Sequence, residues 1–339
     1  MQAKKKFQPL KWLHVFTWIY FTLVFVWAPA HFLLGDHPWW MYVLNALSFY
    51  LFVPCLLVLP VAWKMRRRAT WVAVLLVFLL AIFFYGRQFI PWRAALPSSA
   101  GHALTVMTYN VLGFNFHTKE VTDAILASGA DVISLQELNP QVAQAIRDDL
   151  SGTYPYQQLD AQDSVFGSGV ISRYPLHLTG ETLSGGWVGT PQILSLTVDG
   201  KSITLINAHV FASHPDFPEI MDASIAERER QARDIKAFAV QHTGPLIVTM
   251  DFNSTPQNTS YQIVSSALTD SWLEAGVGPG NTFPNFMPRG VRPRLPLWLI
   301  RIDYVFHSAQ LRAIDAQIGP EDGFSDHRPV IARLVLLGQ

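Results

Sequence analysis

The 339-residue sequence has 25 basic and 25 acidic residues, so its formal net charge is zero. Half of the residues are hydrophobic, and the single cysteine, Cys55, excludes a disulfide framework within one chain. This average conceals two unlike parts. Residues 1–93 carry ten Lys/Arg and one acid, Asp36, whereas the rest carry 15 basic and 24 acidic residues, a net charge of −9. The first part is apolar with basic edges, and the second has the composition of an acidic soluble domain.

Three apolar runs fill the first part, at about Leu10–Leu34, Trp39–Trp63 and Thr70–Ile90. Each has about the 20 residues that an α-helix needs to cross a bilayer, and Trp residues near the ends are typical of interfacial anchors. We therefore predict a membrane domain, residues 1–93, with three transmembrane helices. A cleaved signal peptide ending near Ala28-Pro29-Ala30 is the competing interpretation, but the apolar run continues past it and two more follow.

The distribution of positive charge predicts an orientation for these helices. Lys4–Lys6 and Lys11 precede the first run, and Lys64 with Arg66–Arg68 separates the second run from the third. The other short loop has no Lys or Arg. The positive-inside rule places the N-terminus and the arginine loop in the cytoplasm. The expected localisation is the cell membrane, multi-pass, with the soluble domain extracytoplasmic.

Beyond a predicted linker at 94–103, residues 104–339 combine strand-like and helix-like segments, as in an α/β layered domain. The predicted strands are 104–111, 131–137, 165–172, 192–198, 202–210, 245–249, 302–307 and 330–336. The predicted helices are 118–128, 140–150 and 223–241. Arg228 and Arg233, on the last helix, are expected to be solvated.

Polar side chains stand at the ends of most predicted strands, namely Asn110, Glu137, Asn207 with His209, Asp251 with Asn253, Asp303, and Asp326 with His327. Each one alone is compatible with a solvated edge or a cap, but the conjunction indicates an enzyme that presents polar groups at one edge of its sheet. Mg²⁺ takes oxygen ligands, which Glu137 and Asp326 with Asn110 could supply. An imidazole that titrates near neutral pH can carry proton transfers.

Seven short pieces follow one another along residues 104–337: Thr108-Tyr109-Asn110-Val111, Leu135-Gln136-Glu137, Ser172-Arg173-Tyr174-Pro175, Asn207-Ala208-His209, Asp251-Phe252-Asn253, Arg301-Ile302-Asp303-Tyr304 and Ser325-Asp326-His327. Together they resemble the endonuclease/exonuclease/phosphatase superfamily, whose members include deoxyribonuclease I, abasic-site endonucleases, inositol-phosphate phosphatases and neutral sphingomyelinases. The resemblance implies a four-layer sandwich, two mixed β-sheets packed face to face and flanked by helices, here preceded by three transmembrane helices. The catalytic domain would be residues 104–339.

The resemblance also implies a metal centre. Glu137 looks like the principal metal ligand, with Asn110 beside it, and Asp326 stands where family members hold a metal directly or through water. The expected cofactor is Mg²⁺, and Mn²⁺ fits the same oxygen ligands.

The remaining polar residues match the family's catalytic positions. Asp251 and Asn253 look like the pair that orients the attacking water and contacts the phosphate. His327 looks like the catalytic histidine, and Asp303 like the carboxylate that orients it. His209 occupies a position that many phosphodiesterases and phosphatases of the family fill with histidine, whereas abasic-site endonucleases usually have tyrosine there.

The predicted function is a membrane-anchored, metal-dependent phosphoesterase that acts on a phosphodiester or phosphomonoester of a lipid or lipid-linked headgroup. The stretch Phe283–Ile300 mixes aromatics, leucines and three arginines, and could lie in a headgroup layer. Alternatively, it covers the domain's own core or packs on the spans. A nuclease is the alternative function, for which a net charge of −9 is a poor start unless Arg289, Arg292 and Arg294 form a patch. A non-catalytic protein on a decayed enzyme fold is a third hypothesis, although every expected acid and histidine is present.

Overall fold

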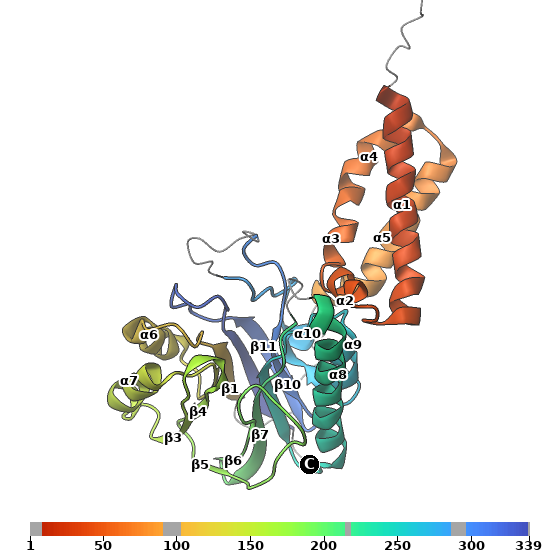
Figure 1. The fold of residues 1–339 in the computed structure, drawn as a ribbon. Coiled ribbons are helices and arrows are strands. Elements are labelled where there is room, and N and C mark those ends of the chain that lie inside the picture. The colour runs from red at the N-terminus through yellow and green to blue at the C-terminus, as the bar shows by residue number, and fades with distance from the viewer. Residues whose placement is uncertain (1–8, 91–102, 214–217, 286–295, 338–339) are drawn as a thin grey trace, which may run out of the picture. The chain divides into compact units, whose positions relative to one another are not determined.

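The computed structural model describes residues 9–90, 103–213, 218–285 and 296–337 (Figure 1). The chain divides into two compact units, Met1–Arg87 and Gln88–Gln339. Of the predicted linker, only Ala103 is among the described residues, and it begins the first strand of the second unit. The domain boundaries at residues 93 and 104 stay predictions.

The first unit is helical, and its first and last helices are continuous. α1 spans Pro9–Leu34, and α5 spans Arg68–Tyr85 and runs into a 3-10 turn, η1, at Gly86–Gln88. Both are long and apolar enough to cross a membrane. The second predicted run is different, because it is not one straight helix. It consists of α2 (Trp39–Ala46), α3 (Phe49–Phe52) and α4 (Pro54–Met65), and the chain bends by 64° after α2.

Polar side chains explain why the second run is broken. Asn45, near the end of α2, donates from Nδ2 to the carbonyl of Gly35 at 2.8 Å and to Oδ1 of Asp36 at 3.0 Å. Ser48 donates to the carbonyl of Asn45 at 2.6 Å. Side chains that bond to nearby backbone compete with helical hydrogen bonds, and Pro54 has no N–H to donate. The described residues therefore offer two candidate spans, or three if the bent pair is one span.

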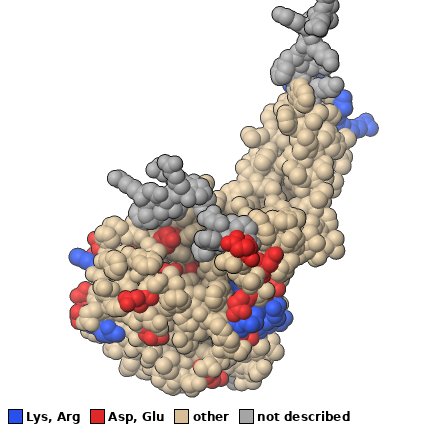
Figure 2. All heavy atoms as spheres, in the orientation of Figure 1, with Lys and Arg blue, Asp and Glu red and all other residues tan. Residues whose placement is uncertain are grey.

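The basic loop between α4 and α5 lies beside the beginning of α1, whereas Arg87 lies in η1, after the end of α5. Figure 2 shows that the visible face of the first unit's helices is almost entirely uncharged, with Lys and Arg side chains near the beginning of α1. Nη1 of Arg67 lies 3.5 Å from Nε2 of His14, so the loop between α4 and α5 meets the beginning of α1. The loop that follows α4 is thus on the same side of the candidate spans as the beginning of α1.

The second unit is built on two mixed six-stranded sheets (Figure 1). The strand order is β11-β12-β1-β2-β4-β3 in the first sheet and β5-β6-β7-β8-β10-β9 in the second. In each sheet one neighbouring pair is parallel, β1 with β2 and β7 with β8, and the other pairs are antiparallel. The strands are β1 Ala103–Asn110, β2 Val132–Gln136, β3 Tyr156–Asp160, β4 Ser168–Ser172, β5 Leu176–Leu178, β6 Gln192–Val198, β7 Lys201–His209, β8 Leu246–Asp251, β9 Thr269–Asp270, β10 Asp303–His307, β11 Leu311–Ile318 and β12 Val330–Leu336.

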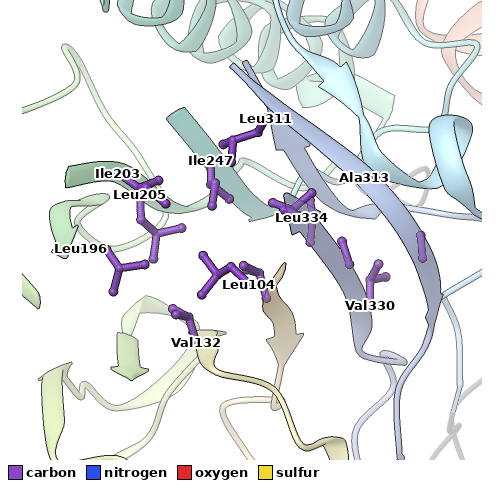
Figure 3. Packing of buried hydrophobic residues seen from close by; sticks show 14 of the residues in the cluster. Leu104, Val132, Leu196, Ile203, Leu205, Ile247, Leu311, Ala313, Val330 and Leu334 are labelled. Atoms are coloured by element: carbon purple, nitrogen blue, oxygen red, sulfur yellow. The ribbon is translucent and has the colours of Figure 1, made fainter. Parts of the chain in front are cut away.

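Alternate side chains of the strands face opposite layers. On β7, Ile203 and Leu205 belong to the core between the two sheets, whereas Ile206 and Ala208 pack on the other side, toward the helices. Figure 3 shows the core between the sheets, where Leu104, Val132, Leu196, Ile247 and Leu334 also meet. Because both faces of the central strands are covered, their sequences read as nearly continuous apolar runs.

Helices cover the outer face of each sheet. Val121 and Ile125 of α6 and Val142 and Ile146 of α7 share a core with the first sheet, and α8 and α9 share one with the second. The bounds are α6 Thr118–Ser128, α7 Pro140–Leu150, η2 Ser164–Phe166, α8 Pro218–Gln241, α9 Thr259–Ser265 and α10 Ser271–Ala275. The predicted four-layer α/β sandwich is confirmed.

Several elements differ from the sequence prediction. The long helix begins at Pro218 instead of residue 223, and the chain at 164–166 is a 3-10 turn that precedes β4. Strands β3, β5, β9 and β11 and helices α9 and α10 were not predicted. β11 carries a bulge between Ala313 and Asp315, which interrupts the apolar–polar alternation that would have marked it. β5 and β9 are only three and two residues long, too short for any periodic pattern.

Candidate active site

Strand register places three of the predicted residues side by side on the second sheet. His209 is the last residue of β7, and the parallel ladder to β8 pairs it with Asp251. The antiparallel ladder between β8 and β10 pairs Asp251 with Asp303. All three are at least nine-tenths buried. A row of two carboxylates and an imidazole therefore crosses the edge of three neighbouring strands.

The first sheet contributes a second pair of residues to the same place. Asn110 ends β1, and Glu137 follows β2 directly. Nδ2 of Asn110 donates to Oε1 of Glu137 and to Oδ2 of Asp251, both at 2.9 Å. Glu137 has a left-handed backbone, with φ of 55°, and its Oε2 accepts the N–H of Gly113 at 2.9 Å. Because Asn110 bonds to acids of both sheets, the two rows of residues form one site.

His327 is held by a carboxylate on one side and faces another. Its Nδ1 lies 3.1 and 3.0 Å from Oδ1 and Oδ2 of Asp303, and its Nε2 lies 3.6 Å from Oδ2 of Asp251. The N–H of His327 donates to Ser325 Oγ at 3.1 Å, and that hydroxyl donates to the carbonyl of Asn110 at 2.7 Å. The ring orientation is thus set by Asp303, and the loop position by β1.

His209 and Asn253 complete the site. Nε2 of His209 lies 3.4 Å from Oδ2 of Asp251 and 4.0 Å from Oε1 of Glu137. Its Nδ1 is buried and has no hydrogen-bond partner within the described part of the chain. Asn253 has φ of 51°; its N–H donates to Oδ1 of Asp251 at 3.1 Å, and its Nδ2 donates to the carbonyl of Val210 at 3.0 Å. Asn253 therefore turns back onto the strand end that carries His209.

The site has more acidic than basic side chains, and burial and their negative charges shift the pKa values of Asp326 and His327. Burial raises the pKa of the Asp326 carboxyl to about 6, and the charges of Glu137 and Asp251 contribute to this rise. Burial also raises the pKa of Asp303, against the opposing effect of His327. Burial alone would lower the pKa of His327, but the carboxylates of Asp303 and Asp251 outweigh it and raise that pKa well above its ordinary value.

The donor set fits a divalent cation. Glu137, His209 and Asp251 offer ligand atoms that all lie within 4.8 Å of one another, and so do Asp251, Asp303 and His327. Asp303 is already engaged by His327, so the carboxylates of Glu137 and Asp251 in the first group are the better-placed ligands. In the described ranges, no Lys or Arg forms an ion pair with these acids. A hard cation would relieve the repulsion among their oxygens.

The predicted ligands Asn110 and Asp326 have different surroundings. Oδ1 of Asn110 accepts the N–H of Leu112 at 3.0 Å, so its amide presents N–H groups, not oxygen, to the acids. Asp326 is absent from both ligand groups; its side chain is 27% exposed, and its Oδ1 lies 4.0 Å from Nε2 of His327. The ligand roles of Asn110, Glu137 and Asp326 and the catalytic roles of the other five residues stay predictions, although the structure brings all eight to one end of the sheets.

Polar residues behind the site tie the sheets together and were not assigned a role from the sequence. Nε2 of Gln136 donates to Oδ1 of Asn207 at 2.7 Å, and Thr249 Oγ1 donates to Ser134 Oγ at 2.7 Å. Thr282 Oγ1 accepts the N–H of Asp303 at 3.3 Å. For the residues of the first two pairs, the signal is a polar residue within an otherwise apolar strand, which costs free energy unless it is hydrogen-bonded; Thr282 lies outside the strands.

The expectation that Arg228 is solvated is wrong. Its side chain is 1% exposed, and it heads the largest fully buried side chains of the described residues. On α8 it continues a stripe of buried residues at spacings of three and four, Met221, Ile225, Ala232 and Ile235. That spacing was the available signal. Arg233, five residues on, is exposed as expected, with 57% of its side chain accessible.

Comparison with known proteins agrees with this architecture. A solved endonuclease/exonuclease/phosphatase from Bacteroides vulgatus is 19% identical, with a TM-score of 0.52 over 70% of this chain and 100% of that one. TDP2 from D. rerio, complexed with a single-strand DNA product, is 15% identical, with a TM-score of 0.54 over 69% of this chain and 99% of its own. TDP2 from C. elegans is 18% identical, with a TM-score of 0.54 over 70% and 76%. At these identities the likeness shows the fold alone.

A search of curated protein sequences found no match. The model of the Endonuclease/Exonuclease/phosphatase family matches residues 107–327, which is more than half of the chain and includes every residue of the site. The chain belongs to the endonuclease/exonuclease/phosphatase family.

Proposed function

We propose that the second unit is a divalent-metal-dependent phosphoesterase that uses Mg²⁺ or Mn²⁺. The observation that carries this proposal is the convergence of Glu137, His209, Asp251 and the Asp303–His327 pair at one end of the two sheets. Glu137 would hold the cation with Asp326, and Asn110, whose amide donates to Glu137, would orient that carboxylate. When bound, the cation withdraws charge from a phosphoryl oxygen and stabilises the leaving oxygen.

The chain's own residues position the water and move its proton. Asp303 holds the His327 imidazole so that Nε2 faces Asp251, and either this pair or Asp251 accepts the proton of the attacking water. His209 and Asn253 donate hydrogen bonds to phosphate oxygens as negative charge develops on them. The unpartnered, buried Nδ1 of His209 leaves the tautomer of this ring unfixed by the protein, so Nε2 is free to act as the donor.

Metal removal tests the chemistry directly. We expect the detergent-solubilised full chain to hydrolyse bis(p-nitrophenyl) phosphate or p-nitrophenyl phosphate with Mg²⁺ or Mn²⁺. After chelation the rate should fall by about 100-fold or more and return when metal is added back. The measurement is nitrophenolate release. A panel of phospholipids, sphingomyelin, inositol phosphates and plasmid DNA then identifies the natural class. Equal rates with and without metal on every substrate would refute the proposal.

The finer proposal is that the ester belongs to a membrane lipid or a lipid-linked headgroup. The candidate spans of the first unit would keep the second unit within reach of a bilayer. The basic loop around Arg67 and the beginning of α1 share one end of the spans, and the positive-inside rule assigns that end to the cytoplasm. With three spans, the catalytic unit would act on the extracytoplasmic face.

Exposed aromatic side chains next to the site support a lipid substrate. Phe114 and Phe116, 64% and 60% exposed, lie on the loop that follows Asn110. Phe166, the last residue of η2, is 48% exposed, and a Cβ at Gly113 would meet the backbone of Ser164 in the same turn. Phe211 is 38% exposed, two residues beyond His209. Aromatic rings of this kind partition into the headgroup region of a bilayer. Trp298 is half exposed and donates to Asn285 at 2.9 Å, while residues 286–295 of the predicted lipid-contact stretch lie outside the described residues.

Replacing Phe114 and Phe116 together with serine should separate lipid contact from chemistry. We expect hydrolysis of phospholipid vesicles to fall by about 10-fold or more, because burying each ring in the interface contributes roughly 1.5–3 kcal/mol. Hydrolysis of soluble bis(p-nitrophenyl) phosphate should be unchanged. The matched control is Leu178→Ser, an exposed apolar residue on β5. Equal losses on vesicles and on the soluble ester would count against lipid contact.

A nuclease is the second candidate, favoured by one observation. The similar TDP2 from D. rerio was crystallised with a single-strand DNA product. Against it stands the net charge of −9 over residues 94–339, since nucleic-acid affinity rests largely on Lys and Arg. The possible patch at Arg289, Arg292 and Arg294 lies outside the described residues. Metal-dependent degradation of plasmid DNA, without activity on any lipid, would establish this alternative.

A further inference from the structure

Two side chains of α8, Arg228 and Gln231, bind both backbone groups of one residue beyond the end of β7, Phe211. Nε of Arg228 donates to the carbonyl of Phe211 at 2.8 Å, and Oε1 of Gln231 accepts the N–H of the same residue at 3.1 Å. The two residues are three apart on the helix, so they project from one face. They are 1% and 0% exposed. Both backbone groups of Phe211, which lies past the last ladder pair of β7, are therefore held by α8.

Phe211 is close in sequence to the candidate catalytic residues. Phe211 is two residues beyond His209, and between them Val210 donates its N–H to the carbonyl of Asp251 at 3.0 Å. The carbonyl of Val210 accepts Nδ2 of Asn253 at 3.0 Å. A shift of Phe211 would move Val210 with it, and so would disturb both His209 and the amide of Asn253.

Arg228 also reaches the second loop of the site. Its Nη1 donates to Ser254 Oγ at 3.4 Å, and its Nη2 contacts Ser213 Oγ. Ser254 follows Asn253, and its carbonyl accepts the Tyr304 hydroxyl at 2.8 Å. One guanidinium thus joins the segment leaving β7 to the segment leaving β8. Its planar fork of N–H groups suits this task, which a lysine ammonium cannot reproduce.

We propose that Arg228 and Gln231 are positioning residues that keep His209 and Asn253 aligned with Asp251. A buried arginine costs far more desolvation free energy than an apolar side chain of similar size, and the neighbouring positions of the same stripe are apolar. If the side chain at position 228 only filled space, a methionine would pack there as well. The polar pair supplies fixed hydrogen bonds to the two loops, and small displacements of reacting groups are expensive in rate. This inference rests on the proposed phosphoesterase activity.

The test compares Arg228→Lys and Gln231→Leu with Arg233→Lys, a control on the exposed side of the same helix. The full chain in detergent is assayed on bis(p-nitrophenyl) phosphate with Mn²⁺, and the exchange of the Phe211 amide hydrogen is measured by mass spectrometry. We expect kcat to fall by about 10- to 100-fold in the first two variants with KM unchanged. Gln231→Leu should also lose protection of the Phe211 amide. The control should match the wild type in all readouts.

The outcomes separate this inference from the proposed function. Wild-type kcat in both Arg228→Lys and Gln231→Leu would overturn the positioning role. So would a loss of kcat in Gln231→Leu with the Phe211 amide as protected as in the wild type, or a loss in either variant that merely follows a lower melting temperature. If the wild type hydrolyses no phosphate ester, the proposed function fails. The exchange of the Phe211 amide in Gln231→Leu then still shows whether Gln231 holds the Phe211 backbone.

Discussion

Replacing Glu137 or His327 with alanine is expected to abolish metal-dependent phosphoester hydrolysis. Glu137 touches Asn110 and Gly113 and stands 4.0 Å from His209, while His327 is held by Asp303 and faces Asp251. Removing a positioned acid–base or charge-stabilising group lowers rates by roughly 10²- to 10⁴-fold. That corresponds to about 3–5 kcal/mol of transition-state stabilisation. We expect kcat/KM on bis(p-nitrophenyl) phosphate to fall over this range in each variant.

Matched controls show whether such losses come from the site. Glu181→Ala and His177→Ala remove the same side chains from exposed positions of the second unit, and both should keep wild-type activity. Calorimetric titration with Mn²⁺ adds an independent readout, since Glu137→Ala should weaken metal binding and His327→Ala should weaken it less. Substantial turnover in either site variant would remove the assignment of that residue.

Breaking the buried Arg301–Asp270 pair is expected to cost the most stability. Nη1 and Nη2 of Arg301 lie 3.1 and 2.8 Å from the two carboxylate oxygens of Asp270, and both side chains are 2% exposed. The Tyr261 hydroxyl donates to the same carboxylate at 2.8 Å, and the guanidinium lies 4.6 Å from the centre of the Tyr304 ring. Arg301→Met leaves Asp270 buried without its countercharge. We expect the unfolding free energy of the second unit to fall by about 3–5 kcal/mol.

A double-mutant cycle in urea measures this effect. Arg301→Met with Asp270→Leu removes both charges. The double variant should cost less than either single change, because each single change leaves one buried charge without its partner and the double variant leaves none. The control pair is Arg173 with Asp131, 3.2 Å apart, in which 41% of the arginine side chain is exposed. Its disruption should cost less than about 1 kcal/mol. Additive costs for Arg301 and Asp270 would show that the two do not interact as the structure implies.

Much of the second unit could be predicted because its strands carry a local signal. Segments such as 192–198 and 202–210 are apolar runs of strand length, and the structure has β6 at Gln192–Val198 and β7 at Lys201–His209. The candidate site residues could be proposed because polar side chains at successive strand ends stand out against such apolar runs. Their order along the chain, together with the seven short pieces, led to the family that the match over residues 107–327 confirms.

The elements that escaped prediction depend on contacts that no local pattern encodes. β9 is two residues long and exists because Asp270 and Thr269 pair with β10. The second apolar run breaks because Asn45 bonds back to Gly35 and Asp36, nine or ten residues away. Composition alone could not distinguish this bent pair from a continuous span, because the pair together has the length and hydropathy that a spanning helix needs.

Residue types and their spacing were enough to indicate two dissimilar parts, an α/β sandwich and a set of acids and histidines suited to phosphate chemistry. Their spatial relations needed the folded chain, since strand register pairs His209 with Asp251 and Asp251 with Asp303, and Asn110 joins them to Glu137 across the two sheets. Arg228 shows the same division: its charge predicts a solvated side chain, but packing of α8 against the second sheet buries it on the backbone beside the site. Hydrophobic periodicity acts over a few residues, whereas these contacts join residues from 17 to 141 positions apart, so only the tertiary structure sets them.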